Sequence, residues 1–369
     1  MNRILIILLL ASFVIIFLIG LYVGISKVFP FSELNNLKDE LELRSYNLDY
    51  NSYPVELNNS ISLQNPNDIE QKRNQLIQFI WKTNSLPQEL PDTIDRNIID
   101  KRFSNFSNLK QIDRLTIKME HELSSIVYVF IPEKNNGNVM LYHQGHSGGF
   151  INGKSTIQKF LDSGFTVAAF SMPLLGLNNQ PVIDMEDLGS VKLFKHNQFV
   201  LLESENFSSM SYFFTPISIT LNYFSENFSF NNFHMVGISG GGWTTTVYPA
   251  LDTRITKSFS VAGSLPLALR ITIDDVGDYE QFHPEFYSIA NYLELYIMSS
   301  SGNGREHFQI FNKYDSCCFA VNSLDLFENS MKKYFSKFDS GNFDILIDDT
   351  HKQHKISNSI SDFIIKKTT

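Results

Sequence analysis

One serine of the chain lies at the centre of a glycine-rich turn, Gly237-Ile238-Ser239-Gly240-Gly241. The apolar run at residues 233–238 leads into the turn, and a segment compatible with a helix follows it. A strand, a sharp turn and a helix are predicted, with the serine at the apex. Glycines flank such a turn because a β-carbon there would collide with the neighbouring backbone. The serine hydroxyl would then stand clear of the sheet, although a plain glycine-rich turn has the same pattern.

A serine hydroxyl becomes a useful nucleophile only beside a base that a third group orients. His354 follows the last predicted strand and directly precedes the closing helix, which makes it the candidate base; His351 in the same loop is the alternative. Asp315 follows the preceding predicted strand and is the candidate acid. Loops at the carboxyl ends of parallel strands are where open α/β sheets place their functional groups.

Attack on a carbonyl also requires hydrogen-bond donors for the oxygen that becomes negative. The glycines in residues 142–149, Tyr-His-Gln-Gly-His-Ser-Gly-Gly, let backbone N–H groups turn toward such an oxygen, so the amides of His146 and Gly240 are the candidate donors. Residues 148–155 overlap this loop and match the phosphate-binding pattern G-x-x-x-x-G-K-[ST]. A nucleotide site would leave Ser239 unexplained, so we favour the oxyanion interpretation and keep the phosphate loop as the alternative.

Alternating strands and helices are predicted to position these residues. Continuous apolar strands separated by helices favour a mainly parallel sheet covered on both faces. An Asn135-Asn136-Gly137 turn precedes one of the strands, and Asp68 is the expected N-cap of the first helix of this region. We predict strands at 115–122, 125–132, 138–143, 166–171, 233–238, 255–261, 307–312 and 343–347, and helices at 68–82, 155–161, 207–224, 321–335 and 355–365.

The chain divides into three predicted regions. Residues 4–25 carry no charge and would span about 33 Å as a helix, which predicts a transmembrane anchor with the large domain outside the cytoplasm. Residues 26–110 are expected to form a stalk and a helical extension, and residues 111–369 the α/β domain. Residues 263–305 are too long for a simple connection and predict a cap over the site. The acidic run in this segment is interpreted as solvated surface.

Composition excludes some other functions. A net charge of −9 and the lack of a Lys/Arg stripe argue against nucleic-acid binding. Cys317 and Cys318 are adjacent, so they cannot supply the usual ligand spacing of a zinc site; we expect two buried small side chains, with a vicinal disulfide as the alternative. We identify no metal-binding and no cofactor-binding residues.

The order Ser239, Asp315, His354, together with the glycine turn and an upstream His143-Gln144-Gly145, resembles the α/β-hydrolase superfamily over about residues 115–365. The resemblance implies a mostly parallel eight-stranded sheet with helices on both faces, no cofactor, and cleavage of a small-molecule carboxylic ester through an acyl-enzyme. The turn at His143 differs from the His-Gly-Gly-Gly form of many lipases and esterases. A thioesterase or peptidase of this fold, or an inactive binding module, stays open.

Overall fold

The computed structural model describes residues 3–26, 60–270, 277–315, 317–319 and 341–369, and a few positions between 328 and 335. Side chains in the first helix are described from residue 10 to residue 23. Much of the predicted stalk, and most of the helix predicted at residues 321–335, lie outside the described residues.

A nine-stranded sheet forms the centre of the molecule, in the order β1-β2-β3-β5-β4-β8-β9-β10-β11. Neighbouring strands are parallel from β5 to β11 and antiparallel from β1 through β3 to β5. The ninth strand, β1, adds an edge that the prediction of eight strands lacked, since three residues are too few to show a period. The strands are β1 (Thr93–Asp95), β2 (Leu109–Lys118), β3 (Ser124–Pro132), β4 (Asn138–His143), β5 (Thr166–Phe170), β8 (Asn232–Ile238), β9 (Ile255–Val261), β10 (Glu306–Asn312) and β11 (Asn342–Asp348).

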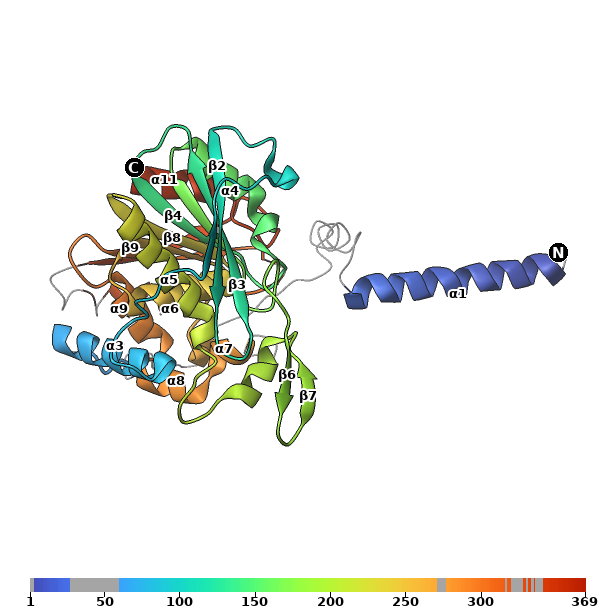
Figure 1. Ribbon diagram of the computed structural model, residues 1–369, viewed down its shortest axis with the longest axis horizontal. Coiled ribbons are helices and arrows are strands. Elements are labelled where there is room, and N and C mark those ends of the chain that lie inside the picture. Colours follow the sequence, from blue (N-terminus) through green and yellow to red (C-terminus); the bar gives the residue numbers. More distant parts are fainter. Residues whose placement is uncertain are drawn as a thin grey trace.

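Helices cover both faces of this sheet, as Figure 1 shows. Alternate residues of β4 enter different cores: Val139 and Leu141 join the core under α3, α5, α6 and α9, whereas Met140 and Tyr142 join the core under α4 and α11. Every residue of β4 is therefore buried. The helices are α3 (Pro66–Trp81), α4 (Lys154–Asp162), α5 (Ser211–Asn227), α6 (Gly240–Leu251), α9 (Tyr292–Ser300) and α11 (Asn358–Thr368).

The start of α3 corrects one predicted cap. Asn65, and not Asp68, is the N-cap: its side chain accepts hydrogen bonds from the backbone N–H groups of Asn67 and Asp68. Asp68 in turn accepts from the backbone N–H of Asn65 at 3.1 Å, which completes a capping box. Pro66 fits the first turn because its missing N–H would have no helical acceptor there.

Two segments outside the regular alternation lie near the carboxyl ends of the strands. Between β5 and β8 the chain forms a hairpin of β6 (Val182–Met185) and β7 (Gly189–Lys192), which projects from the body in Figure 1, and then the 3-10 helix η5 (His196–Leu202). Between β9 and β10 it forms η6 (Leu267–Leu269), α7 (Tyr279–Phe282) and α8 (Pro284–Ile289) before α9. Helix α9 packs on α6 and serves as the crossover between two parallel strands.

Helix α1 (Arg3–Ser26) stands apart from this body in Figure 1. Within the described part of the chain, no helix combines the length and the apolar character that crossing a membrane requires. The predicted transmembrane anchor and single-pass membrane location are therefore wrong.

Candidate active site

Ser239 forms the turn between β8 and α6. Its backbone is left-handed and strained, with φ 58° and ψ −128°, a conformation that non-glycine residues rarely adopt. A β-carbon on Gly237 would lie 2.0 Å from the backbone oxygen of Gly241, so the chain can fold back this tightly only with glycine there. Ser239 itself is partly exposed. The turn therefore presents the hydroxyl above the end of the sheet, as the flanking glycines predict.

The loop after β4 crosses directly over this turn. A β-carbon on Gly145 would lie 2.5 Å from Cβ of Ser239 and 3.1 Å from the backbone nitrogen of Gly240. The ring of His146 covers Gly240, since a β-carbon on Gly240 would lie 2.4 Å from Cε1 of His146. Gly240 is the first residue of α6, so its N–H has no acceptor within the helix. The two residues predicted to supply oxyanion donors are thus neighbours.

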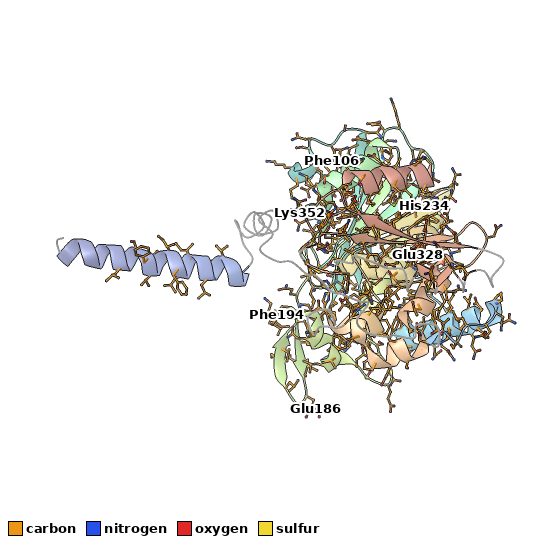
Figure 2. All side chains as sticks on the ribbon, turned by 180° about the vertical axis from the view of Figure 1, so that it is seen from behind. Phe106, Glu186, Phe194, His234, Glu328 and Lys352 are labelled. Carbon is orange, nitrogen blue, oxygen red and sulfur yellow. A yellow bond between two sulfur atoms is a disulfide. The ribbon has the colours of Figure 1, made fainter. Side chains whose placement is uncertain are left out.

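His354 and Asp315 form a hydrogen-bonded pair. Nδ1 of His354 lies 2.7 Å from Oδ2 of Asp315, and the Asp315 side chain is fully buried. The histidine comes from the loop between β11 and α11, which Lys352 marks in Figure 2. Because β8, β10 and β11 run parallel, Ser239, Asp315 and His354 each follow a strand at the same edge of the sheet.

Asp315 accepts hydrogen bonds on both carboxylate oxygens. Oδ1 accepts from the backbone N–H groups of Cys317 and Cys318, at 2.8 and 3.2 Å, and Oδ2 also accepts from the side-chain amide of Asn312 at 3.2 Å. Burial raises the pKa of Asp315, but the charge of His354 and these hydrogen bonds outweigh burial and hold the pKa below its usual value. The carboxylate is therefore kept ionised beside the ring.

His351, the alternative base, belongs to another pair. Its Nε2 lies 3.2 Å from Oδ2 of Asp348, and its side chain is buried. The other oxygen of Asp348, Oδ1, accepts hydrogen bonds from the backbone N–H and the hydroxyl of Thr350. Of the two histidines in this loop, His354 is therefore the one that the fold brings to Asp315.

The cysteines following Asp315 differ from the expectation. Cys317 and Cys318 are joined in a vicinal disulfide, with Cys317 exposed and Cys318 partly exposed. The prediction of two buried small side chains is thus wrong. The backbone N–H groups of both cysteines reach the Asp315 carboxylate; Cys317 is left exposed, and Cys318 packs partly buried against the core.

Residues 148–155, which match a phosphate-binding pattern, do not have the structure of a phosphate-binding loop. The 3-10 turn η4 (Phe150–Gly153) lies between Gly148 and α4, and it ends at Gly153, the N-cap of the helix. The ammonium group of Lys154 lies 5.6 Å from the centre of the Phe103 ring, a cation–π contact, and Ser155 is exposed. This arrangement disfavours the phosphate-loop alternative.

Sequence reasoning missed several polar residues next to these loops. Asn312 ends β10 and donates from its side chain to both Asp315 and the backbone oxygen of Lys355, a role that its place at a strand end could have suggested. Glu280, assigned to a solvated acidic run, is fully buried and lies against His146 and His196. These three residues are far apart in the sequence, so no local spacing could have revealed the contact.

Comparison with known proteins identifies the fold. No family model matches the chain, and no curated protein sequence matches it. Among solved structures, the chain is similar to acetyl xylan esterase 1 from Thermoanaerobacterium sp. JW/SL YS485, with a TM-score of 0.55 and 14% identity, covering 86% of this chain and 99% of that one. It is also similar to methylesterase BT1017, with a TM-score of 0.59 and 14% identity, covering 88% of this chain and 68% of that one.

A third similar structure is the acetyl xylan esterase from Paenibacillus sp. R4, with a TM-score of 0.53 and 14% identity, covering 85% of this chain and 98% of that one. Together with the strand order and the serine turn after β8, these similarities establish the α/β-hydrolase fold. At such low sequence identity they define the fold and leave the activity to be argued from the site.

Proposed function

We propose that this protein is a serine hydrolase that cleaves a carboxylic ester, with Ser239 as nucleophile, His354 as base and Asp315 as the residue that orients the base. The observation that carries the proposal is the 2.7 Å contact between His354 and a buried, fully hydrogen-bonded Asp315, at the sheet edge where Ser239 occupies its strained turn. A strained serine and a histidine held by a buried carboxylate are the parts that acyl transfer needs.

The reaction follows from these positions. As Oγ of Ser239 attacks the carbonyl carbon, Nε2 of His354 accepts its proton, while Asp315 keeps the other proton on Nδ1 and stabilises the imidazolium that forms. The backbone N–H groups of Gly240 and His146 donate to the oxygen that becomes negative. The tetrahedral intermediate then expels the alcohol, which takes the proton from His354. Water activated by the same histidine hydrolyses the acyl-enzyme and releases the acid.

Labelling with a fluorophosphonate probe tests the nucleophile directly. The wild-type protein and the control Ser155→Ala, which removes an exposed serine on α4, should label equally, whereas Ser239→Ala should not label. Far-UV circular dichroism would verify that each variant is folded. Labelling that persists in Ser239→Ala, or no labelling of the folded wild type, would overturn the proposal.

A panel of esters tests the substrate class. The similar structures are named as acetyl xylan esterases and a methylesterase, so the panel pairs acetylated xylan with a methyl-esterified polysaccharide and with p-nitrophenyl esters of increasing acyl length. We expect Ser239-dependent hydrolysis of at least one carboxylic ester. A protein that labels at Ser239 yet cleaves only thioesters or peptides would contradict the ester assignment while retaining the nucleophile.

A further inference from the structure

Beside the serine turn, four side chains from separate segments converge on one point. His146 lies in the loop after β4, His196 is the first residue of η5, and Asp278 and Glu280 come from the start of α7. Two imidazole nitrogens and two carboxylates all lie within 4.8 Å of one another. None of these side chains has a role as a proton donor or acceptor in the reaction proposed above.

The distances within this cluster match those between the ligands of a small metal ion. Nε2 of His146 lies 2.8 Å from Oε1 of Glu280, 3.2 Å from Nδ1 of His196 and 3.2 Å from Oδ2 of Asp278. Nδ1 of His196 lies 3.2 Å from Oε1 of Glu280. Ligands at about 2.0–2.1 Å from a tetrahedral metal ion are about 3.3 Å apart, close to these separations.

The orientation of His196 supplies a ligand atom to the cluster. Its Nε2 lies 2.9 Å from the backbone oxygen of Pro173, to which an N–H donates, so the lone pair of a neutral ring would be on Nδ1 and point at Glu280. The Phe199 ring stacks on the imidazole, with centroids 5.5 Å apart, and fixes its plane. In protein metal sites, a histidine ligand usually donates a hydrogen bond from its other ring nitrogen to a backbone carbonyl, a carboxylate or a water molecule.

Glu280 supplies the second, independent observation. Its side chain is fully buried, and among the described residues its Oε2 accepts no hydrogen bond, although it lies 3.2 Å from Nδ1 of His196. A buried carboxylate oxygen without a donor is costly unless a cation compensates it. Asp278, the N-cap of α7, does not use its side chain to cap the helix and lies against His146 instead. Two carboxylates and two neutral imidazoles would carry the charge that a divalent cation neutralises.

We propose that His146, His196, Asp278 and Glu280 bind one divalent metal ion of the zinc class. Nitrogen and carboxylate ligands in a tetrahedral set suit Zn²⁺. The side chains of Asp278 and His146 are 46% and 26% exposed, which gives the ion a route from solvent. Bound there, it would tie the loop after β4 to η5 and α7, and so hold His146 over Gly240. The site is independent of whether Ser239 is a nucleophile.

Zinc content and affinity test the site. After chelation and dialysis against Zn²⁺, the wild type should retain one zinc ion per chain by elemental analysis. In calorimetric titration with Zn²⁺, the affinity should fall at least about tenfold in Asp278→Asn and further in Glu280→Gln. The matched control is His121→Gln, which removes an exposed histidine elsewhere and should leave stoichiometry and affinity unchanged.

Cobalt spectra and thermal unfolding separate this site from the catalytic proposal. Co²⁺ bound in a tetrahedral site should give the intense visible absorption of that geometry in the wild type and in Ser239→Ala, but not in Glu280→Gln. Zn²⁺ should raise the melting temperature of the wild type and of Ser239→Ala alike. Asp278 is half exposed, so Asp278→Asn is expected to fold even where Glu280→Gln does not. Retention of no zinc by the wild type, or equal affinity in folded Asp278→Asn, would overturn the proposal.

Discussion

Asp315 and Glu280 are both fully buried carboxylates that face histidines, but their other partners differ. Asp315 accepts from His354, from Asn312 and from two backbone N–H groups, so both of its oxygens are occupied by donors. Within the described part of the chain, the Glu280 carboxylate contacts imidazole nitrogens, those of His146 and His196. The first arrangement fixes one proton on one ring, which is what a base in acyl transfer needs. The second has more acceptors than donors, and that favours a bound cation.

The two carboxylates share a lowered pKa for related reasons. For each, burial raises the pKa, and the charges of the neighbouring histidines together with hydrogen bonds lower it by more. For Asp315 the backbone and the Asn312 amide lower it further, whereas for Glu280 the additional contribution comes from His146. Both groups therefore stay ionised at neutral pH, and it is the supply of donors around them that distinguishes the two regions.

The largest expected effect is a loss of kcat on substitution of His354, compared with substitutions of histidines elsewhere in the two regions. His354→Gln removes the proposed base and should lower kcat for an ester substrate by about a thousandfold or more. His351→Gln removes the neighbouring histidine that pairs with Asp348, and His196→Gln removes one from the second cluster; each should change kcat by less than about tenfold. Steady-state kinetics on folded variants would decide. Equal losses of kcat for His354→Gln and His351→Gln would contradict the assignment of His354 as the base.

Glu280 should matter more for stability than for chemistry. Glu280→Gln removes the buried charge that His146 and His196 face, which should lower the free energy of unfolding by about 3 kcal/mol. Denaturant unfolding would measure it. The control Glu285→Gln removes an exposed acid on α8 and should leave the free energy of unfolding unchanged. A Glu280→Gln protein as stable as the wild type would show that the cluster does not stabilise the fold.

The lowered pKa of Asp315 predicts a pH dependence of stability. The stabilisation from its ionised form is fully present above the unfolded value of about 3.9, and it is lost as the pH falls through the lower, folded value. The advantage of the wild type over Asp315→Asn in free energy of unfolding should therefore shrink on acidification, by at most about 1.4 kcal/mol for each pH unit. Unfolding curves from pH 7 to pH 3 would test this. An advantage that grows on acidification would contradict the cause assigned here.

Asn312 should have the smallest effect. Its side chain donates to Asp315 at 3.2 Å and to the Lys355 backbone at 3.1 Å, so it positions the acid against the loop of His354. Asn312→Ala should lower kcat by about threefold to tenfold and leave KM unchanged, as expected for the loss of a single hydrogen bond. Partial rescue in Asn312→Gln would support a hydrogen-bonding role, whereas a rise in KM alone would indicate a role in substrate binding instead.

The sequence by itself determined the local parts of this protein. Turn chemistry placed the strained serine at Ser239, because only glycines on both sides permit the turn, and apolar periodicity placed β4 and β9 at the residues where the structure has them. The position of Asp315 and His354 after consecutive strands could also be predicted from the sequence, since parallel strands bring their carboxyl ends to one edge of the sheet. These features depend on residues close together in the chain.

Only the tertiary structure decided the contacts between distant segments. His196 and Glu280 are 84 positions apart and meet because η5 and α7 pack together beside the serine turn. The choice of His354 over His351 depends on which ring the loop turns toward Asp315, and the exposed position of Cys317 depends on the backbone N–H groups of both cysteines reaching that carboxylate. Such contacts arise from packing in three dimensions, for which the period of a sequence carries no signal.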